Sequence, residues 1–354
     1  MSEFLTSKLQ RLEPYTPGEQ PKERKYIKLN TNESPFPPSE KAIAYSRREA
    51  ERLMLYSDPE CRDLIDALSK SFKVGKENLI ATNGSDEVLN FAFMAYCDDN
   101  CPAVFADITY GFYKVFAAIN NVPYVQIPLK EDFTIDVNEY INTHGTVFIA
   151  NPNAPTGIEL SVKEIERLGA QNPKRVVVID EAYVDFGAES CIDLVSKYDN
   201  LLVTGTFSKS RSMAGARLGF GIASEKIIND LNRIRYSTNP YNVNRMTAAA
   251  GVGALEDDDY FRDNLKKIIE NRKWTVSALK DLGFELTDSK ANFIFAKHNA
   301  VGGEELYLKL KENGILVRHF NAPRISEYNR ITIGSITEME TLVDKIKEIV
   351  GETR

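Results

Sequence analysis

The sequence has few of the residues that build disulfide bonds or metal centres. Its 354 residues include four cysteines and only three histidines, which are scattered along the chain. So few cysteines in a chain of this size do not form a disulfide framework, and the pattern is typical of a reducing compartment. Cys97 and Cys101 are close in sequence, but no ligand cluster has the spacing of a zinc site, so we expect no metal.

Long apolar runs and an excess of basic charge are also missing. No stretch reaches the roughly 18 apolar residues of a membrane helix, and residues 1–14 lack the apolar core of a signal peptide. The formal net charge is −7, which argues against nucleic acid because proteins that bind it normally present a basic face. We therefore expect a cytoplasmic protein that contacts neither a membrane nor nucleic acid.

What is present is the composition of a soluble globular enzyme, with 43% hydrophobic and 27% charged residues. A chain of this length favours one large domain and a smaller one. Residues 1–38 are polar and rich in proline, which is typical of an extended arm rather than a packed element. We predict an arm over 1–38, a large domain over 39–245 and a small C-terminal α+β domain over 246–354.

Short apolar segments alternate with helical or turn-rich stretches through the middle of the chain. These segments are 79–81, 103–105, 124–127, 147–149, 176–179, 201–203 and 218–221. Strands buried on both faces have this composition, so we predict an α/β fold with a mostly parallel sheet between helices. Helices are expected from Ser39 towards Leu55 and over 85–96. A long helical region over 243–282 is interrupted only at Asp257–Asp259, and short strands and helices follow it.

One lysine lies in a loop of hydroxylated residues between two predicted strands. Lys209 is surrounded by Thr206, Ser208 and Ser210, and Arg217 follows eight positions later. Hydroxyl groups and an arginine can hold a phosphate, and a lysine amine can form a Schiff base with an aldehyde. The loop therefore predicts pyridoxal 5'-phosphate bound to Lys209, although by residue type alone a surface lysine would be the commoner interpretation.

Two other strand ends carry groups that this cofactor needs. Asp180 ends an apolar strand, where ligands bind in open α/β sheets, and its carboxylate can pair with a pyridine nitrogen. Tyr183 can hydrogen-bond the ring hydroxyl. Gly84 and Ser85 precede a helix whose N-terminal N–H groups favour a phosphate. The alternatives are that Asp180 caps the next helix and that Asp86 is an ordinary first-turn acid.

Further candidates are weaker when each is taken alone. Tyr110 could stack on the cofactor ring, although a single tyrosine there is more typical of a core. The segment Asn151–Gly157 has more constrained residues than an ordinary turn needs, which favours a functional role. Arg318 and Arg330 lie at predicted strand ends, where a planar guanidinium can grip a carboxylate or phosphate, or can form a surface ion pair.

Taken in this order, the motifs resemble the fold-type I pyridoxal-phosphate enzymes over nearly the whole chain, and within them the histidinol-phosphate aminotransferase family. The motifs that carry the resemblance are Leu29–Pro35, Tyr56-x-Asp58, Asn83–Glu87, Asp180–Tyr183, Ser208-Lys209 with Arg217, and Arg330–Gly334. The resemblance implies a class II aminotransferase fold, with a large cofactor-binding domain and a smaller α+β domain.

The resemblance also implies roles for residues. Lys209 would carry the cofactor, Asp180 would pair with its ring nitrogen and Tyr183 would contact its ring oxygen. The residues expected around the cofactor phosphate are Gly84, Ser85, Asp86, Thr206, Ser208 and Arg217, with Tyr110 over the ring. The residues expected at the substrate are Tyr15 and Asn32, with Arg330 on its carboxylate and Arg318 on its phosphate. Tyr56 would reach the phosphate of a neighbouring subunit, which implies a homodimer with shared active sites.

The chain departs from the family pattern at one position. The family usually has a second asparagine before Pro155, which hydrogen-bonds the ring oxygen, and this chain has Ala154 there. Either Asn153 shifts into that role or Tyr183 acts alone.

The resemblance implies amino transfer from L-histidinol phosphate to 2-oxoglutarate in histidine biosynthesis, with a small-molecule amino donor and a 2-oxo acid acceptor. A threonine-phosphate decarboxylase and an aromatic-amino-acid aminotransferase share the motif set and stay as alternatives. A ligand-sensing domain of a transcription regulator belongs to a different class. It would need a basic DNA-binding segment, for which the chain has neither room nor charge.

Overall fold

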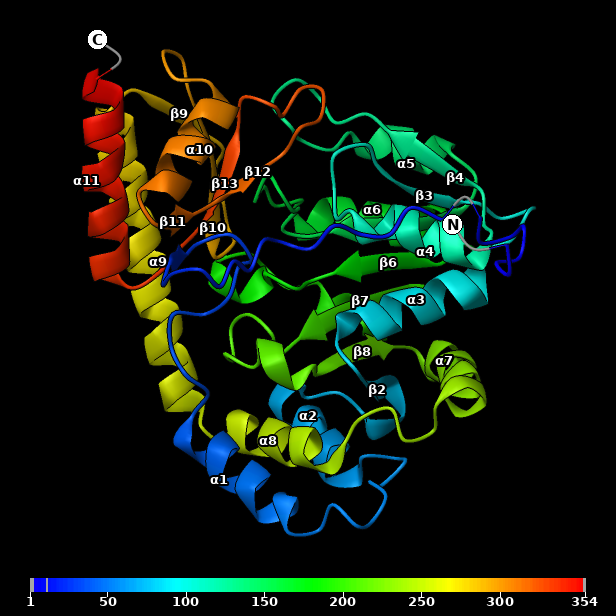
Figure 1. Ribbon diagram of the computed structural model, residues 1–354. Coiled ribbons are helices and arrows are strands. Elements are labelled where there is room, and N and C mark those ends of the chain that lie inside the picture. The colour runs from blue at the N-terminus through cyan, green and yellow to red at the C-terminus, as the bar shows by residue number, and fades with distance from the viewer. Residues whose placement is uncertain (1–2, 11, 353–354) are drawn as a thin grey trace.

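The computed structural model describes residues 3–10 and 12–352; the outermost residues of the predicted arm and small domain, and Arg11, lie outside this part. A seven-stranded sheet forms the centre of the large domain (Figure 1). Its strands are β2 (Leu79–Thr82), β3 (Ala103–Ala106), β4 (Tyr124–Ile127), β5 (Thr146–Ala150), β6 (Val177–Asp180), β7 (Leu201–Thr206) and β8 (Gly219–Ala223). The order is β2-β8-β7-β6-β5-β3-β4, and only β8 runs against its neighbours. The predicted α/β fold with a mostly parallel sheet is confirmed.

Helices cover both faces of this sheet. One face carries α2 (Arg62–Phe72), α5 (Val137–Asn142), α6 (Val162–Gln171) and α8 (Arg245–Leu255), and the other carries α3 (Ser85–Tyr96), α4 (Phe112–Asn120) and α7 (Glu225–Thr238). Alternate residues of β5 serve the two faces: Val147 and Ile149 enter one core, and Phe148 and Ala150 enter the other. This two-sided burial explains why the strands are apolar throughout.

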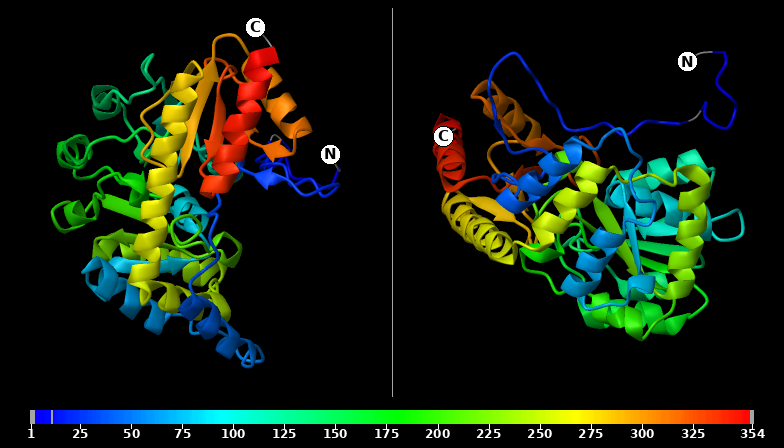
Figure 2. Two further views of the ribbon diagram at one scale, coloured as in Figure 1. Left: turned by 90° about the vertical axis from the view of Figure 1, so that its left-hand side faces the viewer. Right: turned by 90° about the horizontal axis from the view of Figure 1, so that it is seen from below.

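The small domain is a four-stranded antiparallel sheet covered by helices. Its strands run in the order β12 (Arg318–His319), β13 (Asn329–Thr332), β10 (Phe293–His298) and β9 (Phe284–Leu286). The helices are the long α9 (Asp258–Asp281), α10 (Gly303–Glu312) and α11 (Ile336–Glu352). Figure 2 shows α9 running from the large domain into the small one, where it lies beside α11. The break between α8 and α9 falls at the predicted acidic run, Asp257–Asp259.

The arm differs from its prediction in its second half. Strand β1 (Ile27–Lys28) pairs in parallel with β11 (Ile315–Leu316) of the small domain, and Leu29 is buried in that domain's core. The sequence indicated an unpacked arm because prolines flank this segment, but none lies within it, so its backbone N–H groups remain available for pairing. The arm therefore connects the small domain to the site described below.

The first helix, α1 (Glu40–Ala50), begins as predicted, with the Ser39 hydroxyl accepting a hydrogen bond from the N–H of Ala42. It ends five residues before the predicted Leu55, and the side chains of Leu53, Met54 and Leu55 are exposed. Within the described residues, no helix is long and apolar enough to cross a membrane.

Candidate active site

A cavity of about 770 Å³ lies where the carboxyl ends of the central strands face the small domain and the arm. Most of the predicted site residues line it, although they come from distant parts of the chain. These residues are Tyr15, Asn32, Ser85, Asp86, Tyr110, Asp180, Tyr183, Thr206, Ser208, Lys209, Arg217, Arg318 and Arg330. A larger cleft of about 1020 Å³ lies between α1, α2 and α8, but none of the predicted catalytic or ligand-binding residues lines it. The first cavity is therefore the candidate active site.

Lys209 places its amine between the large domain and the arm. It follows β7, and its Nζ donates a hydrogen bond to the carbonyl oxygen of Thr31 at 3.2 Å. The same nitrogen lies 5.9 Å from the centre of the Tyr183 ring. The amine thus lines the cavity, and the hydrogen bond that holds it there among the described residues goes to a neutral carbonyl group.

Asp180 is the buried acid of the cavity, with 5% of its surface exposed. Its carboxylate accepts weak hydrogen bonds from Thr204 Oγ1 at 3.3 Å and from the Tyr113 hydroxyl at 3.4 Å. Burial, reinforced by the nearby Asp86, raises the pKa of Asp180 to about 6. It forms no ion pair within the described part of the chain, so it suits a ligand that brings a positive charge.

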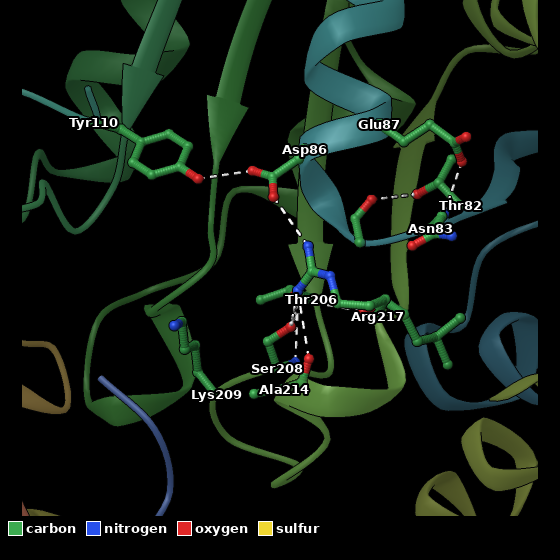
Figure 3. A network of polar contacts seen from close by, with 12 residues as sticks. Thr82, Asn83, Asp86, Glu87, Tyr110, Thr206, Ser208, Lys209, Ala214 and Arg217 are labelled. Carbon is green, nitrogen blue, oxygen red and sulfur yellow. Dashed lines mark hydrogen bonds and ion pairs between the residues drawn. The ribbon is translucent and has the colours of Figure 1, made fainter. Parts of the chain in front are cut away.

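An anion seat surrounds the start of α3, as Figure 3 shows. Arg217 pairs with Asp86 at 3.0 Å, and Asp86 also accepts a hydrogen bond from the Tyr110 hydroxyl at 2.8 Å. On the other side, Arg217 lies 3.4 Å from the Ser208 hydroxyl, which accepts from Thr206 at 2.9 Å. The N–H of Glu87 donates to the Gly84 carbonyl at 3.3 Å, whereas the preceding N–H groups of Ser85 and Asp86 have no acceptor within the helix. Together with Arg217 and the hydroxyls they form a donor set that fits a phosphate.

The seat also depends on two glycines. Gly84 has a φ of +76°, and a Cβ there would lie 2.6 Å from Nη2 of Arg217. A Cβ on Gly219 would lie 2.3 Å from the backbone of Gly84. Only glycine therefore permits both the approach of β8 to the loop and the position of the guanidinium. The sequence indicated Gly84; the role of Gly219 was missed because it arises from strand pairing.

Arg318 and Arg330 form a second cationic region at the opposite wall. They are directly opposed across the antiparallel strands β12 and β13. Arg330 donates to the carbonyl oxygen of Asn30 at 3.0 Å, and its Nε is buried without a partner. Burial lowers the pKa of Arg330, and the charge of Arg318 acts in the same direction.

Neither arginine of this pair forms an ion pair with a carboxylate among the described residues. Arg318 donates instead to the carbonyl oxygens of Pro17 and Thr16, at 3.3 Å and 3.2 Å, and so holds the arm near Tyr15. Like charges directly opposed across strands repel each other. An anion between the two guanidinium groups would relieve this repulsion, which makes the pair a candidate anion-binding site.

The structure does not place the Asn153 side chain in the cavity. Its Oδ1 accepts from the Thr109 hydroxyl at 2.7 Å, and its Nδ2 donates to the Ile108 carbonyl at 3.0 Å and to Thr156 Oγ1 at 3.1 Å. Ala154 lines the cavity in its place. Because the hydrogen-bonding groups of the Asn153 amide are already occupied, the geometry favours the alternative in which Tyr183 acts without it.

Tyr56 also lies away from the cavity of its own chain. Its side chain is 79% exposed and stacks on Tyr241, with ring centres 4.5 Å apart. Its carbonyl oxygen accepts a hydrogen bond from Arg245 at 3.1 Å. Within one chain, Tyr56 contributes nothing to the cavity.

Some residues that shape the cavity were missed by sequence reasoning. Glu87 accepts from the N–H of Asn83 at 2.7 Å and from Asn242 at 2.5 Å, which braces the anion seat from the α7–α8 loop. Arg324 pairs with Asp107 at 3.0 Å and joins the small domain to the large one at the cavity wall. Such contacts over long sequence separations leave no local pattern that could have revealed them.

Comparisons with known proteins find similar sequences and a similar fold. The model of the family "Aminotransferase class I and II" matches residues 24–346. A histidinol-phosphate aminotransferase of Brachyspira hyodysenteriae is 49% identical over 354 residues, which cover 99% of each chain. The enzyme of the same name from Clostridium acetobutylicum is 44% identical over 99% of this chain and 100% of its own. The crystal structure of histidinol-phosphate aminotransferase from Sinorhizobium meliloti in complex with pyridoxal-5'-phosphate is 23% identical, with a TM-score of 0.91 over 100% of this chain and 99% of that one. Because the sequence identity is only 23%, this last comparison shows that the two proteins share a fold and nothing more.

Proposed function

Because the chain belongs to the class I and II aminotransferases, and within them to the histidinol-phosphate aminotransferases, we propose that it transfers the amino group of L-histidinol phosphate to 2-oxoglutarate. The products are imidazole acetol phosphate and glutamate, in histidine biosynthesis. The cofactor is pyridoxal 5'-phosphate, the ligand in the Sinorhizobium meliloti structure.

The observation that carries the proposal is the opposed pair Arg318 and Arg330, which line the same cavity as Lys209 and Asp180. Each half-reaction brings an anion to the cavity: the amino donor has a phosphate, and the 2-oxo acid has two carboxylates. We assign the donor phosphate to Arg318 and the substrate carboxylate to Arg330. Tyr15, which packs on Phe112, would lie on the substrate side, and Asn32 would support that side from its edge, where its amide contacts Tyr183 and Thr332.

The donor set of the other wall fits the cofactor. Ser85, Thr206, Ser208 and Arg217, with the backbone N–H of Asp86 and the close approach permitted by Gly84, would hold its phosphate. Asp180 would pair with the ring nitrogen, and that positive charge would restore the ionised carboxylate that burial disfavours. Tyr183 would donate to the ring oxygen, Tyr110 would cover the ring, and Asn153 would support the adjoining loop from behind.

When bound, the cofactor supplies the electron sink that makes the substrate α-carbon acidic. Lys209 would hold the cofactor through its Nζ until substrate arrives. Its freed amine is then the base that removes the proton from the α-carbon and returns it during the transfer. The neutral contact of Nζ with the Thr31 carbonyl would keep the amine near the reacting atoms.

We further propose a homodimer in which Tyr56 reaches the cofactor phosphate of the partner subunit. Leu53, Met54, Leu55 and Tyr56 are all more than half exposed, at 59%, 80%, 54% and 79%. They lie close in sequence to the residues of the large charged cleft beside α1 and α2. We place the enzyme in the cytoplasm, since its four cysteines are free thiols.

The test is a comparison of amino donors with the purified enzyme and pyridoxal 5'-phosphate. We expect L-histidinol phosphate to yield glutamate only when 2-oxoglutarate is present. Threonine phosphate should release no carbon dioxide, and phenylalanine should react far more slowly. Carbon dioxide release from threonine phosphate, or a clear preference for phenylalanine, would replace this function with one of those two activities.

A further inference from the structure

Asn32 occupies an unusual position for a side chain at the edge of a cavity. It is 1% exposed, its φ is +55°, and it lies on the arm between the two domains. Its backbone N–H donates to Thr332 Oγ1 at 3.0 Å, and its carbonyl oxygen accepts from Asn292 Nδ2 at 3.0 Å. Both main-chain groups are therefore held by the small domain, which fixes where the Asn32 side chain lies.

The hydrogen bonds determine which way the Asn32 amide faces. Thr332 is buried, and its hydroxyl has one proton, which it donates to Asn32 Oδ1 at 3.1 Å. With the amide reversed, this buried proton would have no acceptor among the described residues, and such a loss is costly. The Asn32 oxygen therefore faces Thr332, and its Nδ2 faces Tyr183.

This orientation fixes the role of the Tyr183 hydroxyl. Asn32 Nδ2 donates to the Tyr183 oxygen at 3.0 Å, so at that contact the tyrosine is the acceptor. The phenol proton is then free for a different direction. Tyr183 and Ala154 both line the cavity, and the alanine side chain has no group that could compete for that proton.

We propose that Asn32 is a positioning residue, oriented by Thr332, which makes the Tyr183 hydroxyl a hydrogen-bond donor towards the cavity. The inference deepens the proposed function and rests on it, because the acceptor is the ring oxygen of the bound cofactor. It explains how this chain can work without a polar side chain at position 154. It also links the small domain to the cofactor, since Thr332 lies two residues after Arg330 on β13.

The test uses the visible absorption band of the holoenzyme, titrated with pH. A hydrogen bond donated to the ring oxygen stabilises its anionic form and lowers the apparent pKa of the band. In Asn32→Asp the new carboxylate accepts the Tyr183 proton, and aspartate tolerates the positive φ. We expect this variant to raise the apparent pKa by about one unit, as Tyr183→Phe should, because a hydrogen bond to a charged group has that magnitude.

The double variant of Asn32→Asp and Tyr183→Phe separates two effects of the aspartate: its added charge and its hydrogen bond with Tyr183. In the Tyr183→Phe background, we expect Asn32→Asp to shift the band by less than half as much as in the wild type. Lys209 and Arg330, the nearby cations, are present in all four proteins, so their influence cancels. An equal shift in both backgrounds would overturn the inference, because charge alone gives that result.

A second pair of variants adds no charge. Thr332→Val removes the hydroxyl that orients Asn32, and Thr332→Ser keeps it. We expect the valine variant to raise the apparent pKa of the band and the serine variant to leave it unchanged. Identical bands in both would contradict the proposal even if Asn32→Asp did not fold. If the wild-type protein with pyridoxal 5'-phosphate showed no visible band, the proposed function would be overturned as well. If the band were normal and Asn32→Asp shifted it equally in the wild type and in Tyr183→Phe, only the role of Asn32 would be overturned.

Discussion

Among the described residues, each wall of the cavity carries a charge without a counterion, and the two unpaired charges have opposite signs. On the large-domain wall, Asp180 is a buried acid that forms no ion pair in the described structure, and burial raises its pKa to about 6. On the small-domain wall, Arg318 and Arg330 are opposed cations with no carboxylate partner among the described residues. By contrast, Arg217 has its own acid, Asp86, at 3.0 Å.

This difference separates ligands that stay from ligands that leave. Arg217 belongs to a seat whose groups already contact one another, so little reorganisation is needed to hold a permanent cofactor. The Arg318 and Arg330 pair is stabilised most when an anion binds between the two guanidinium groups, and it loses that stabilisation when the product leaves. The unpaired acid and the unpaired cations are complementary to the ring nitrogen of the cofactor and to the anionic substrates.

The largest expected effect comes from the residue between the two walls. Lys209→Ala should lower kcat by about 10³-fold or more, because the proton transfer loses its base. Lys226, which is 81% exposed at its side chain and pairs with Asp199, supplies the matched control, and Lys226→Ala should leave kcat unchanged. Steady-state assays with L-histidinol phosphate measure both. If Lys209→Ala kept full activity, the two walls would not belong to one active site.

The substrate wall is tested by Arg330→Lys, which keeps the charge but loses the planar fork. We expect kcat/KM for 2-oxoglutarate, whose carboxylate we assign to Arg330, to fall by about 10²-fold, since bidentate charge-assisted contacts are worth roughly 1.5–3 kcal/mol. The value for L-histidinol phosphate, which has no carboxylate, should fall less. Cofactor affinity, measured by equilibrium titration of the absorbance, should not change. A loss of cofactor affinity equal to the loss in kcat/KM would erase the distinction between the walls.

The unpaired acid predicts a pH dependence of the apoprotein. The folded-state pKa of Asp180 lies at about 6, above its ordinary 3.8, so its stabilising contribution is complete below about pH 4 and is lost as pH rises through 6. The loss is on the order of 2–3 kcal/mol in the free energy of unfolding. Burial also raises the pKa of Glu181 to about 7, so Asp180→Asn should reduce this pH dependence without abolishing it.

Urea unfolding of the apoprotein between pH 4.5 and pH 7.5 (roughly the window over which Asp180 titrates) measures this effect. The cofactor should weaken the dependence in the wild type, because its ring nitrogen brings the missing positive charge. If the free energy of unfolding changed with pH equally in the wild type and in Asp180→Asn, Asp180 would already be ionised without the cofactor ring nitrogen.

The smallest effect concerns the cofactor seat. Gly84→Ala introduces a Cβ 2.6 Å from Arg217 at a residue with a φ of +76°, and we expect about tenfold weaker cofactor binding. Gly215 is the control, because a Cβ there meets nothing within 4 Å. Binding curves of both variants give the comparison. Equal affinities for Gly84→Ala and Gly215→Ala would show that the seat adapts more than its packing suggests.

Much of this architecture could be predicted from the sequence because its signals are local. Apolar strands, the cap at Ser39, the break at Asp257–Asp259 and the loop around Lys209 each depend on neighbours in the chain. The carboxyl ends of parallel strands lie along one edge of a sheet, so the sequence alone places Asp180 and Lys209 at that same edge.

The rest depends on contacts between distant segments. The pairing of β1 with β11 and the contacts of Asn32 with Thr332 join residues that are about 300 positions apart. The opposition of Arg318 and Arg330 follows from strand register, which the sequence does not specify by itself. The occupied amide of Asn153 likewise depends on Thr109 and Ile108, from a separate loop.

The central claim is that the Arg318 and Arg330 pair selects a phosphorylated amino donor. Its most direct test is a comparison of steady-state kinetics with L-histidinol phosphate and with L-histidinol, which lacks only the phosphate. We expect the wild type to prefer the phosphorylated donor by about 10²-fold or more in kcat/KM, and the double variant Arg318→Gln, Arg330→Gln to lose most of that preference. A double variant that still prefers the phosphorylated donor as strongly as the wild type would contradict the account.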